Sequence, residues 1–245
     1  MRFRVRRVTT TRAGGVSKPP FDTFNLGDHV GDDPAAVAAN RHRLATALGL
    51  SAGAGHDGRD DQIVWMNQVH STNVRVVDDA AETPDDTDGL VTARPGLALA
   101  VVTADCVPVL MADARAGVVA AVHAGRVGAQ NGIVGRALET MESVGAHAED
   151  MSVLLGPAVS GRNYEVPEQM AAEVEQALPG SRTTTARGTA GLDLRAGIAA
   201  QLRSLGVHAV DIDPRCTVAD RSLFSHRRGA PTGRLASLIW LEPVS

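Results

Sequence analysis

Three side chains in the middle of the sequence could together bind a metal ion. His70, Cys106 and His123 each stand at the end of a predicted strand, next to residues typical of a loop. Two imidazoles and one thiolate make three protein ligands with a fourth position left open, which is the arrangement of a catalytic zinc, whereas structural zinc usually has four protein ligands. Copper also accepts this ligand set, so the ligands alone leave the metal undecided.

The spacing of these residues matches no short metal-binding motif, because 36 and 17 residues separate them. Two other interpretations therefore stay open. In one, Cys106 is a nucleophile and His123 is its general base, as in a metal-free hydrolase. In the other, the histidines are polar strand ends and Cys106 is a small core residue, the ordinary place of a buried cysteine. Asp105 could handle a proton, although neighbours in a strand point to opposite faces.

Arginines near the C-terminal end suit the recognition of a phosphate or a carboxylate, which a planar guanidinium binds through two parallel hydrogen bonds. Arg227 and Arg228 lie in the polar segment LFSHRRGAPTGR, just before an apolar run. A solvated surface turn is the plain alternative. Asn25 lies in FNLGDHV, a segment whose Gly and Asn residues suit a loop that approaches a ligand closely. These three residues are the predicted contacts to phosphate or substrate.

The elements that must position these residues follow from turn residues and hydrophobic patterning. Short β-branched apolar runs predict adjacent buried strands at 97–103, 107–111 and 118–122. Asp33 and Pro34 predict the start of a helix that Gly49 ends. We expect the other elements as strands at 63–69, 74–77, 153–155, 207–212 and 235–241, and as helices at 128–144, 167–178 and 193–205.

Strands outnumber helices in this pattern, and the two do not alternate regularly. We therefore predict an α/β (α+β) fold, a layered mixed β-sheet sandwich flanked by helices, rather than a doubly wound parallel sheet. Residues 51–61 (SAGAGHDGRDD) predict a surface loop within one domain that spans 1–245.

Composition excludes several classes of protein. The 245 residues are 44% hydrophobic and carry a formal net charge of −4, an ordinary globular composition. Four Phe, two Trp and one Tyr leave few rings to stack on bases, so no nucleic-acid partner is expected. No apolar run approaches the ~18 residues of a membrane helix, and no signal peptide is recognisable. We expect a cytoplasmic protein with free thiols, no membrane contact and no obligate protein partner.

Segments spread over almost the whole sequence resemble the bacterial YfiH-like proteins. This family is also called laccase-domain or multicopper polyphenol oxidase-like, and it includes purine nucleoside phosphorylases related to mammalian FAMIN. The matching segments occur in the family's order and at compatible distances. They are TTRAGGVSKPPFDTFNLGDHVGDDPAAVAANR, NQVHSTNV, DGLV, TADCVPVL, AAVHAG, LLGPAVSGRNYEV, LDLR and CTVADRSLFSHRRGAPTGRLASLIWL.

The resemblance implies an activity, a fold and a set of site residues. It places His70, Cys106 and His123 on the family's zinc triad and implies a YfiH-like fold. The implied enzyme is cytosolic and cleaves adenosine, inosine and methylthioadenosine with inorganic phosphate, giving the free base and ribose 1-phosphate or its methylthio analogue. It also implies adenosine deaminase activity at the same site. A copper oxidase of phenols, which the older laccase name implies, and a non-enzymatic zinc-binding or partner-binding protein remain the alternatives.

The sequence departs from the family pattern directly after the third predicted ligand. Where the family commonly has His-Ala-Gly-Trp-Arg-Gly, residues 123–128 read HAGRVG, so the tryptophan is missing and the arginine is displaced by one position. The zinc deaminase signature H-x-E with P-C-x-x-C is also absent, so the proton-transfer group is not the glutamate of that family. Asp105 is the predicted group for this role.

Overall fold

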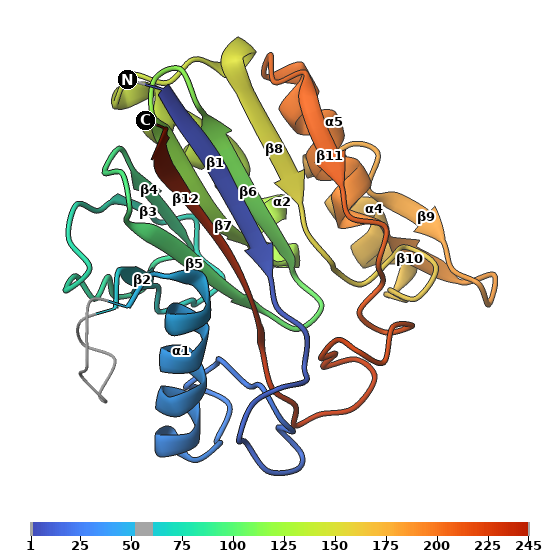
Figure 1. Ribbon diagram of the computed structural model, residues 1–245. Helices are drawn as coiled ribbons and strands as arrows, with labels where there is room; N and C mark the ends of the chain where they lie inside the picture. The colour runs from blue at the N-terminus through green and yellow to red at the C-terminus, as the bar shows by residue number, and fades with distance from the viewer. Residues whose placement is uncertain (1, 52–60, 245) are drawn as a thin grey trace.

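A computed structural model of the chain describes residues 2–51 and 61–244 (Figure 1). The surface loop expected at 51–61 therefore lies outside the described residues except for its two ends. Those ends, Ser51 and Asp61, form an isolated antiparallel bridge.

Most of the described strands belong to two mixed sheets. The larger sheet has the order β11-β8-β6-β7-β4-β3. Its strands are β3 (Val74–Val76), β4 (Gly89–Thr92), β6 (Val107–Asp113), β7 (Val118–Ala124), β8 (Met151–Leu155) and β11 (Ala209–Ile212). The smaller sheet has the order β1-β12-β5-β2. Its strands are β1 (Arg2–Thr9), β2 (Ile63–Trp65), β5 (Ala98–Thr103) and β12 (Leu235–Val244). A separate hairpin pairs β9 (Arg182–Thr184) with β10 (Ala190–Leu192).

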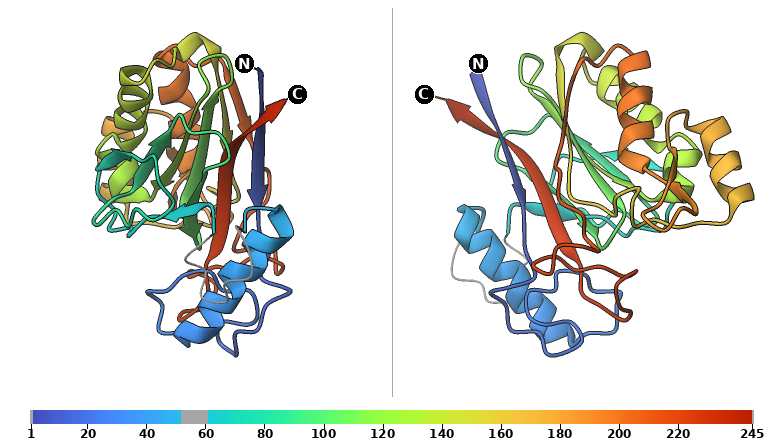
Figure 2. Two further views of the ribbon diagram at one scale, coloured as in Figure 1. Left: turned by 60° about the vertical axis from the view of Figure 1, so that its left-hand side comes forward. Right: turned by 90° about the vertical axis from the view of Figure 1, so that its right-hand side faces the viewer.

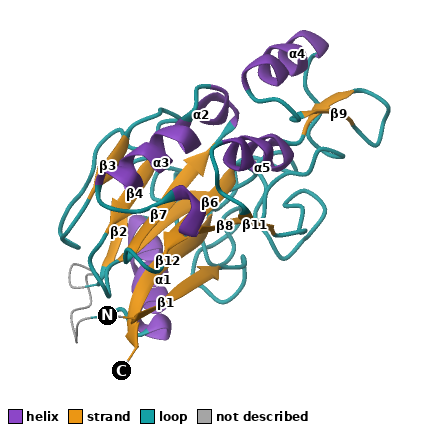
Figure 3. Cartoon of the chain, turned by 90° about the horizontal axis from the view of Figure 1, so that it is seen from above, coloured by secondary structure: helices purple, strands orange, loops and turns teal. Residues whose placement is uncertain are grey.

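Helices cover the outer faces of both sheets. The described helices are α1 (Pro34–Leu48), α2 (Arg126–Gln130), α3 (Ile133–Ser143), α4 (Glu168–Ala177) and α5 (Leu194–Ser204), with a short 3-10 turn at Ala148–Asp150. Figures 2 and 3 show α2 to α5 on one side of the six-stranded sheet and β1 with β12 on its other side. None of the described helices is long and apolar enough to cross a membrane.

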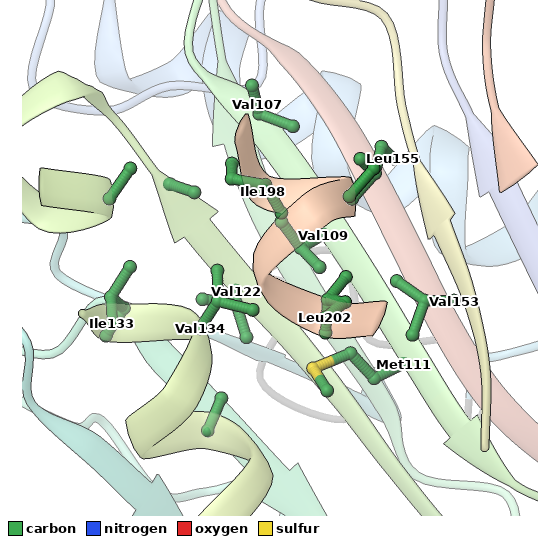
Figure 4. Packing of buried hydrophobic residues seen from close by; sticks show 14 of the residues in the cluster. Val107, Val109, Met111, Val122, Ile133, Val134, Val153, Leu155, Ile198 and Leu202 are labelled. Atoms are coloured by element: carbon green, nitrogen blue, oxygen red, sulfur yellow. The ribbon is translucent and has the colours of Figure 1, made fainter. Parts of the chain in front are cut away.

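The alternation of side chains along the strands explains this layering. In β6, Val109 and Met111 face the helices, whereas Leu110 faces the smaller sheet. In β5, Val101 packs between the two sheets, whereas Ala100 packs on the side of α1. Figure 4 shows side chains of α3 and α5 meeting those of β6, β7 and β8. The layered sandwich predicted from the sequence is therefore the observed architecture.

Several predicted elements hold with small changes of length, and α1 shows why. The Asp33 carboxylate accepts a hydrogen bond from the Ala35 N–H, and Pro34 occupies the first turn. Gly49 ends the helix in the left-handed conformation with φ 69°. These signals are local, so the sequence alone predicts both ends of this helix.

Two predicted elements are wrong in extent. The helix expected at 128–144 is two helices, because Gly132 takes a φ of 89° and breaks the helix between α2 and α3. The strand expected at 63–69 ends at Trp65. Beyond that point the side-chain amide of Gln68 donates to the Val102 carbonyl and accepts from the Val102 N–H, both at 2.8 Å. This amide continues the pairing with β5 while the backbone turns away.

The three adjacent strands that the sequence predicts do not form one sheet. β6 and β7 pair as expected, but β5 pairs with β12 and β2 in the smaller sheet. The chain crosses from one sheet to the other at 104–106. The sequence pattern does not predict β1, β4, β9 and β10. β1 alternates arginines with half-buried Phe and Val and pairs with β12 along its whole length. The crossing at 104–106 is what places Cys106 at an edge between the layers.

Candidate active site

His70, Cys106 and His123 lie together in the structure. Cys106 Sγ is 3.8 Å from His70 Nε2, and one ligand atom from each residue lies within 4.8 Å of the others. Sheet pairing explains the convergence, because His123 in β7 is in register with Pro108 of β6, two residues after Cys106. His70 comes from the loop between β2 and β3. We refer to these three residues as the His-Cys-His cluster.

A buried carboxylate that the sequence analysis did not single out holds two of these residues in place. Asp88 accepts hydrogen bonds from the backbone N–H groups of Val69, His70 and Ser71, from the Ser71 hydroxyl, and from the ring of His123 at 2.8 Å. The backbone N–H of His123 also donates to the backbone carbonyl of Asp88. In the sequence, the one sign of this residue is that an aspartate directly precedes the apolar segment of β4, in DGLV (88–91).

The contact with Asp88 sets which nitrogen of His123 faces the cluster. Burial raises the pKa of Asp88, but hydrogen bonds from His123 and Ser71 outweigh it and hold the pKa at about 2. Asp88 is therefore ionised and can only accept, so Nδ1 of His123 carries a proton toward it. The other ring nitrogen, Nε2, is left for a metal or for Cys106, an orientation that carboxylates commonly impose on metal-binding histidines.

The backbone around the cluster is tightly constrained. His70 has a φ of 61°, the left-handed region that non-glycine residues seldom adopt, and its N–H is bound by Asp88. On the other side, a Cβ added to Gly125 would lie 2.6 Å from His70 Cδ2 and 3.1 Å from Cys106 Sγ. Residue 125 must therefore be glycine for the cluster to keep this geometry.

The electrostatics of the cluster favour a thiolate. Burial raises the pKa of the Cys106 thiol, but the adjacent imidazoles of His123 and His70 outweigh it and lower that pKa to about 6. Burial lowers the pKa of His123, but Cys106 and Asp88 outweigh it and raise that pKa to about 9. Without a metal, the neutral-pH form is a thiolate beside an imidazolium, and a metal ion would take the place of the imidazolium proton.

The cluster opens into a cavity of about 520 Å³, within the range of ~300–1,000 Å³ typical of small-molecule sites. Besides the cluster, its lining brings together imidazoles, guanidiniums, a phenol and apolar side chains from both sheets and from the C-terminal loop. The residues are His29, Gln68, Val102, Thr103, Ala104, Asp105, Arg126, Val159, Tyr164, Leu194, His226, Arg227 and Arg234.

Asp105 and Arg227, two of the predicted site residues, line this cavity and contact each other. The carboxylate of Asp105 accepts hydrogen bonds from the Thr217 hydroxyl at 2.6 Å and from the backbone N–H of Arg227 at 2.7 Å. The Arg227 guanidinium lies over the ring of Tyr164, 4.7 Å from its centroid, and donates to the Glu165 carbonyl. Asp105 thus ties the C-terminal loop to the cluster.

Asn25 and Arg228, the other predicted contacts, do not line the cavity. Asn25 is fully buried, and its side-chain oxygen accepts a hydrogen bond from the backbone N–H of Arg234 at 2.8 Å. The guanidinium of Arg228 donates to the carbonyls of Thr217, Asp220 and Leu223. Both side chains bind backbone groups. Asn25 binds the backbone of Arg234, which lines the cavity, and Arg228 binds backbone carbonyls in the loop that carries Arg227.

Sequence reasoning missed most of the remaining lining. Tyr164 and Arg234 carry no local signal, because arginines recur throughout the chain and the tyrosine stands alone. Arg126 stands out in the sequence only as a departure from the family pattern, not as a site residue. Thr103 is 2% exposed, and its hydroxyl has no hydrogen-bond partner among the residues described. A buried hydroxyl without a partner costs free energy.

The His-Cys-His cluster fits a metal ion by its chemistry. It offers two imidazole nitrogens and one sulfur that is readily a thiolate, with His123 oriented by a carboxylate and one side open to the cavity. Three such ligands with an open position are typical of catalytic zinc. Within 2–51 and 61–244, this is the one group of three or more His, Cys, Asp or Glu residues close enough to hold a metal ion.

Comparison with known proteins gives matches over almost the whole chain. The model of the family described as multi-copper polyphenol oxidoreductase laccase matches residues 6–242. A Mycobacterium tuberculosis protein named purine nucleoside phosphorylase is 73% identical over 240 residues, covering 98% of this chain and 93% of its own length.

Solved structures match in fold as well. Bacillus licheniformis YfiH, described as a hypothetical protein, superposes with a TM-score of 0.87 at 31% identity, covering 97% of this chain and 93% of its own. YlmD from Geobacillus stearothermophilus superposes with a TM-score of 0.86 at 32% identity, covering 98% and 92%. The fold is therefore of the YfiH and YlmD type.

Proposed function

The chain belongs to the multi-copper polyphenol oxidoreductase laccase family, and from its 73% identity to a protein named purine nucleoside phosphorylase we propose that it is an enzyme of that activity. The structural observation that carries the proposal is the cavity of about 520 Å³, which joins the His-Cys-His cluster to three guanidiniums. We propose adenosine, inosine and methylthioadenosine as substrates and inorganic phosphate as co-substrate.

We propose that His70, Cys106 and His123 hold a zinc ion in the active enzyme. Zinc bound there would supply a Lewis acid beside the substrate. Asp88 supports this assignment because it fixes the ring of His123. Copper fits the same three ligands by chemistry, so measuring the metal content is part of the test.

Phosphorolysis makes two demands on the side chains of the cavity. The bond between purine N9 and ribose C1′ breaks, a phosphate oxygen bonds to C1′, and the electron pair leaves with the base, which takes up a proton. Guanidiniums bind phosphate and offset its charge, so Arg227 is a proposed contact. Its guanidinium lies over Tyr164, and its backbone N–H donates to Asp105. The proposed roles of Asn25 and Arg228 are indirect, through the backbone segments that they hold.

We propose adenosine deamination as a second reaction in the same cavity. Water adds at purine C6, ammonia leaves, and inosine is formed, so a side chain must move protons between the water and the leaving amine. Asp105 is the proposed group, although both of its oxygens accept hydrogen bonds from the protein. An Asp105→Asn variant that keeps the phosphorolysis rate but loses deamination would support this role, and one that keeps both rates would contradict it.

The experiment that tests the proposal measures metal and products on the same samples. Wild type, Cys106→Ala and the control Cys216→Ala are compared for zinc and copper by mass spectrometry and for products after incubation with adenosine and phosphate. Cys216 is the suitable control because it is the only other cysteine and does not line the cavity.

About one zinc per chain, with adenine and ribose 1-phosphate formed by wild type and Cys216→Ala but not by Cys106→Ala, is the expected result. Inosine formed in parallel reports the deaminase activity. Purified wild type without turnover of any of the three nucleosides would overturn the proposed function.

A metal-free hydrolase is the second candidate, and one observation favours it. Cys106 and His123 form a thiolate–imidazolium pair at neutral pH, the pair that activates cysteine nucleophiles. This candidate predicts hydrolysis of activated esters by chelator-treated protein, with a covalent acyl group on Cys106. The phosphorylase proposal allows at most one acylation of Cys106 per chain, because its thiolate is reactive without metal, so release of more than one p-nitrophenol per chain from a p-nitrophenyl ester separates the two.

A copper oxidase of phenols, which the family description suggests, has less support. Enzymes that reduce O₂ to water generally need several copper ions, whereas the part of the chain that the structure describes holds one group able to bind a metal. Oxygen consumption with a phenol by copper-loaded protein would favour this alternative.

A further inference from the structure

The cavity contains a guanidinium at a place where the resemblance leads one to expect an indole. We propose that Arg126 binds the inorganic phosphate used in the phosphorolysis. The inference rests on the proposed function and adds a specific residue to it. It is carried by the position of Arg126, by the absence of a charged partner for it in the described chain and by a second cation that lines the same cavity.

Arg126 lies directly beside the His-Cys-His cluster. The preceding residue, Gly125, runs so close to His70 and Cys106 that a Cβ there would overlap His70 Cδ2 at 2.6 Å. Arg126 begins α2 and lines the cavity. Its side chain is half-buried, whereas that of the next residue, Val127, is exposed. The backbone thus places the guanidinium of Arg126, and not the side chain of Val127, at the cavity in which the reaction is proposed.

The guanidinium of Arg126 is poorly satisfied by the protein. Its one hydrogen bond within the described residues goes to the neutral amide of Gln130, on its own helix, at the long distance of 3.5 Å. Within 2–51 and 61–244, it forms no ion pair with a carboxylate. By contrast, Arg234 donates to two backbone carbonyls, and Arg227 stacks on Tyr164 and donates to a carbonyl. A cation in a cavity without an acidic partner favours an anionic ligand.

A second cation, the guanidinium of Arg227, lines the same cavity and lies over the ring of Tyr164. Arg126 and Arg227 both line this cavity, so one tetrahedral anion bound there can contact two guanidiniums. Two planar donor groups suit phosphate, which offers several oxygens at once.

The other role open to Arg126 is to stack on the purine, as a tryptophan would. A guanidinium can lie flat on an aromatic base. The two roles differ in which substrate they affect, because a phosphate contact changes the KM for phosphate and a stacking contact changes the KM for the nucleoside. The absence of an acidic partner within the described chain favours phosphate, since stacking would leave the charge of Arg126 uncompensated.

The test compares Arg126→Gln and Arg126→Lys with the control Arg136→Gln. Arg136 pairs with Glu139 on the exposed face of α3 and lies outside this cavity. We expect Arg126→Gln to raise the KM for phosphate about 10-fold or more while the KM for nucleoside changes less than about 2-fold. Arg126→Lys should recover part of the phosphate affinity because it keeps the charge but not the fork. Arg136→Gln should match wild type.

An unchanged KM for phosphate in Arg126→Gln, or a rise confined to the KM for nucleoside, would overturn the inference. Calorimetric titration of inorganic phosphate into the metal-loaded protein separates this failure from failure of the proposed function. If wild type binds phosphate and Arg126→Gln does not, the anion site stands even when no nucleoside is cleaved. If Arg126→Gln binds phosphate as tightly as wild type, the inference is wrong whatever the enzyme turns over.

Discussion

Five hydrogen bonds converge on the buried carboxylate of Asp88, and they fix both the loop that carries His70 and the ring of His123. Asp88 does not itself belong to the His-Cys-His cluster. Its effect is indirect, because it selects the protonated nitrogen of His123 and holds His70 in a left-handed backbone conformation. At the scale of single residues, the site therefore depends as much on this supporting carboxylate as on the ligands.

Replacing Asp88 by asparagine should weaken metal binding more than it changes the fold. An amide can accept fewer of the five hydrogen bonds and no longer favours the required tautomer of His123. We expect zinc affinity to fall about 10- to 100-fold and the free energy of unfolding to fall by about 2 kcal/mol. Competition with a chromogenic chelator measures the affinity. Asp86→Asn, at an exposed neighbouring position, should leave it unchanged, and equal affinities in all three proteins would contradict the role of Asp88.

The reactivity of Cys106 should depend on pH in a way that reports its neighbours. Because the imidazoles lower the pKa of the thiol to about 6, the thiolate fraction rises through pH 6 rather than near the ordinary value of about 8.5. In metal-free protein carrying Cys216→Ser, alkylation by iodoacetamide should reach half its maximal rate near pH 6. Zinc should protect the thiol above that pH and dissociate below it, as protons displace the metal. A midpoint at the ordinary value of about 8.5 would contradict this prediction.

At the scale of elements, short segments between strands and helices build the site. β5 belongs to the smaller sheet and β6 to the larger, so residues 104–106 cross between layers and bring Cys106 to the edge where β7 ends. The turn from β7 into α2 passes through Gly125, which leaves no room for a side chain beside His70 and Cys106. The positions of the ligands are therefore set by where strands end rather than by the strands themselves.

A methyl group at residue 125 should therefore disrupt the cluster. In Gly125→Ala the new Cβ would meet His70 Cδ2 at 2.6 Å, so the imidazole or the start of α2 must move. We expect metal binding and nucleoside cleavage to fall by at least about 10-fold. In the control Gly135→Ala, inside α3, the Cβ meets only Leu205 Cδ1 at 3.9 Å, and thermal stability should rise slightly. Zinc affinity in Gly125→Ala equal to wild type would show that the turn can adapt.

At the scale of the whole molecule, the cavity draws its lining from both sheets and from distant parts of the chain. Thr103 comes from the smaller sheet, His123 from the larger, and Tyr164 and Arg227 from loops more than 60 residues apart in sequence. Hydrogen bonds such as that from the Arg227 N–H to Asp105 join these parts. Binding at the cluster should consequently stabilise the molecule as a whole.

Metal removal should lower the thermal stability of the entire chain. A ligand that binds only the folded state at 100 times its Kd adds about 2.7 kcal/mol to the free energy of unfolding. For a protein of this size the expected shift in melting temperature is about 5 to 10 °C. Calorimetry with and without zinc measures it, and Cys106→Ala should show no such shift. If zinc does not raise the melting temperature of wild type, the proposal that His70, Cys106 and His123 together bind zinc is contradicted.

Local signals in the sequence determined those features that depend on few neighbouring residues. The caps of α1 lie within the helix or next to it, so both of its ends followed from Asp33, Pro34 and Gly49. The apolar runs of β6 and β7 predicted their burial and their pairing. The residue types of His70, Cys106 and His123 indicated metal or thiolate chemistry, but only the resemblance to a family favoured zinc, because spacing alone could not bring these residues together.

Only the tertiary structure decided which residues share the cavity. It placed β5 in a different sheet from β6, because hydrogen bonding to β12 and β2 is a long-range choice that no local pattern encodes. It also put Asp88 behind the cluster and Arg126 in the cavity, while Arg228 is used to hold a loop. A side chain's partners are set by which distant strands pair, and strand pairing depends on the packing of the whole core.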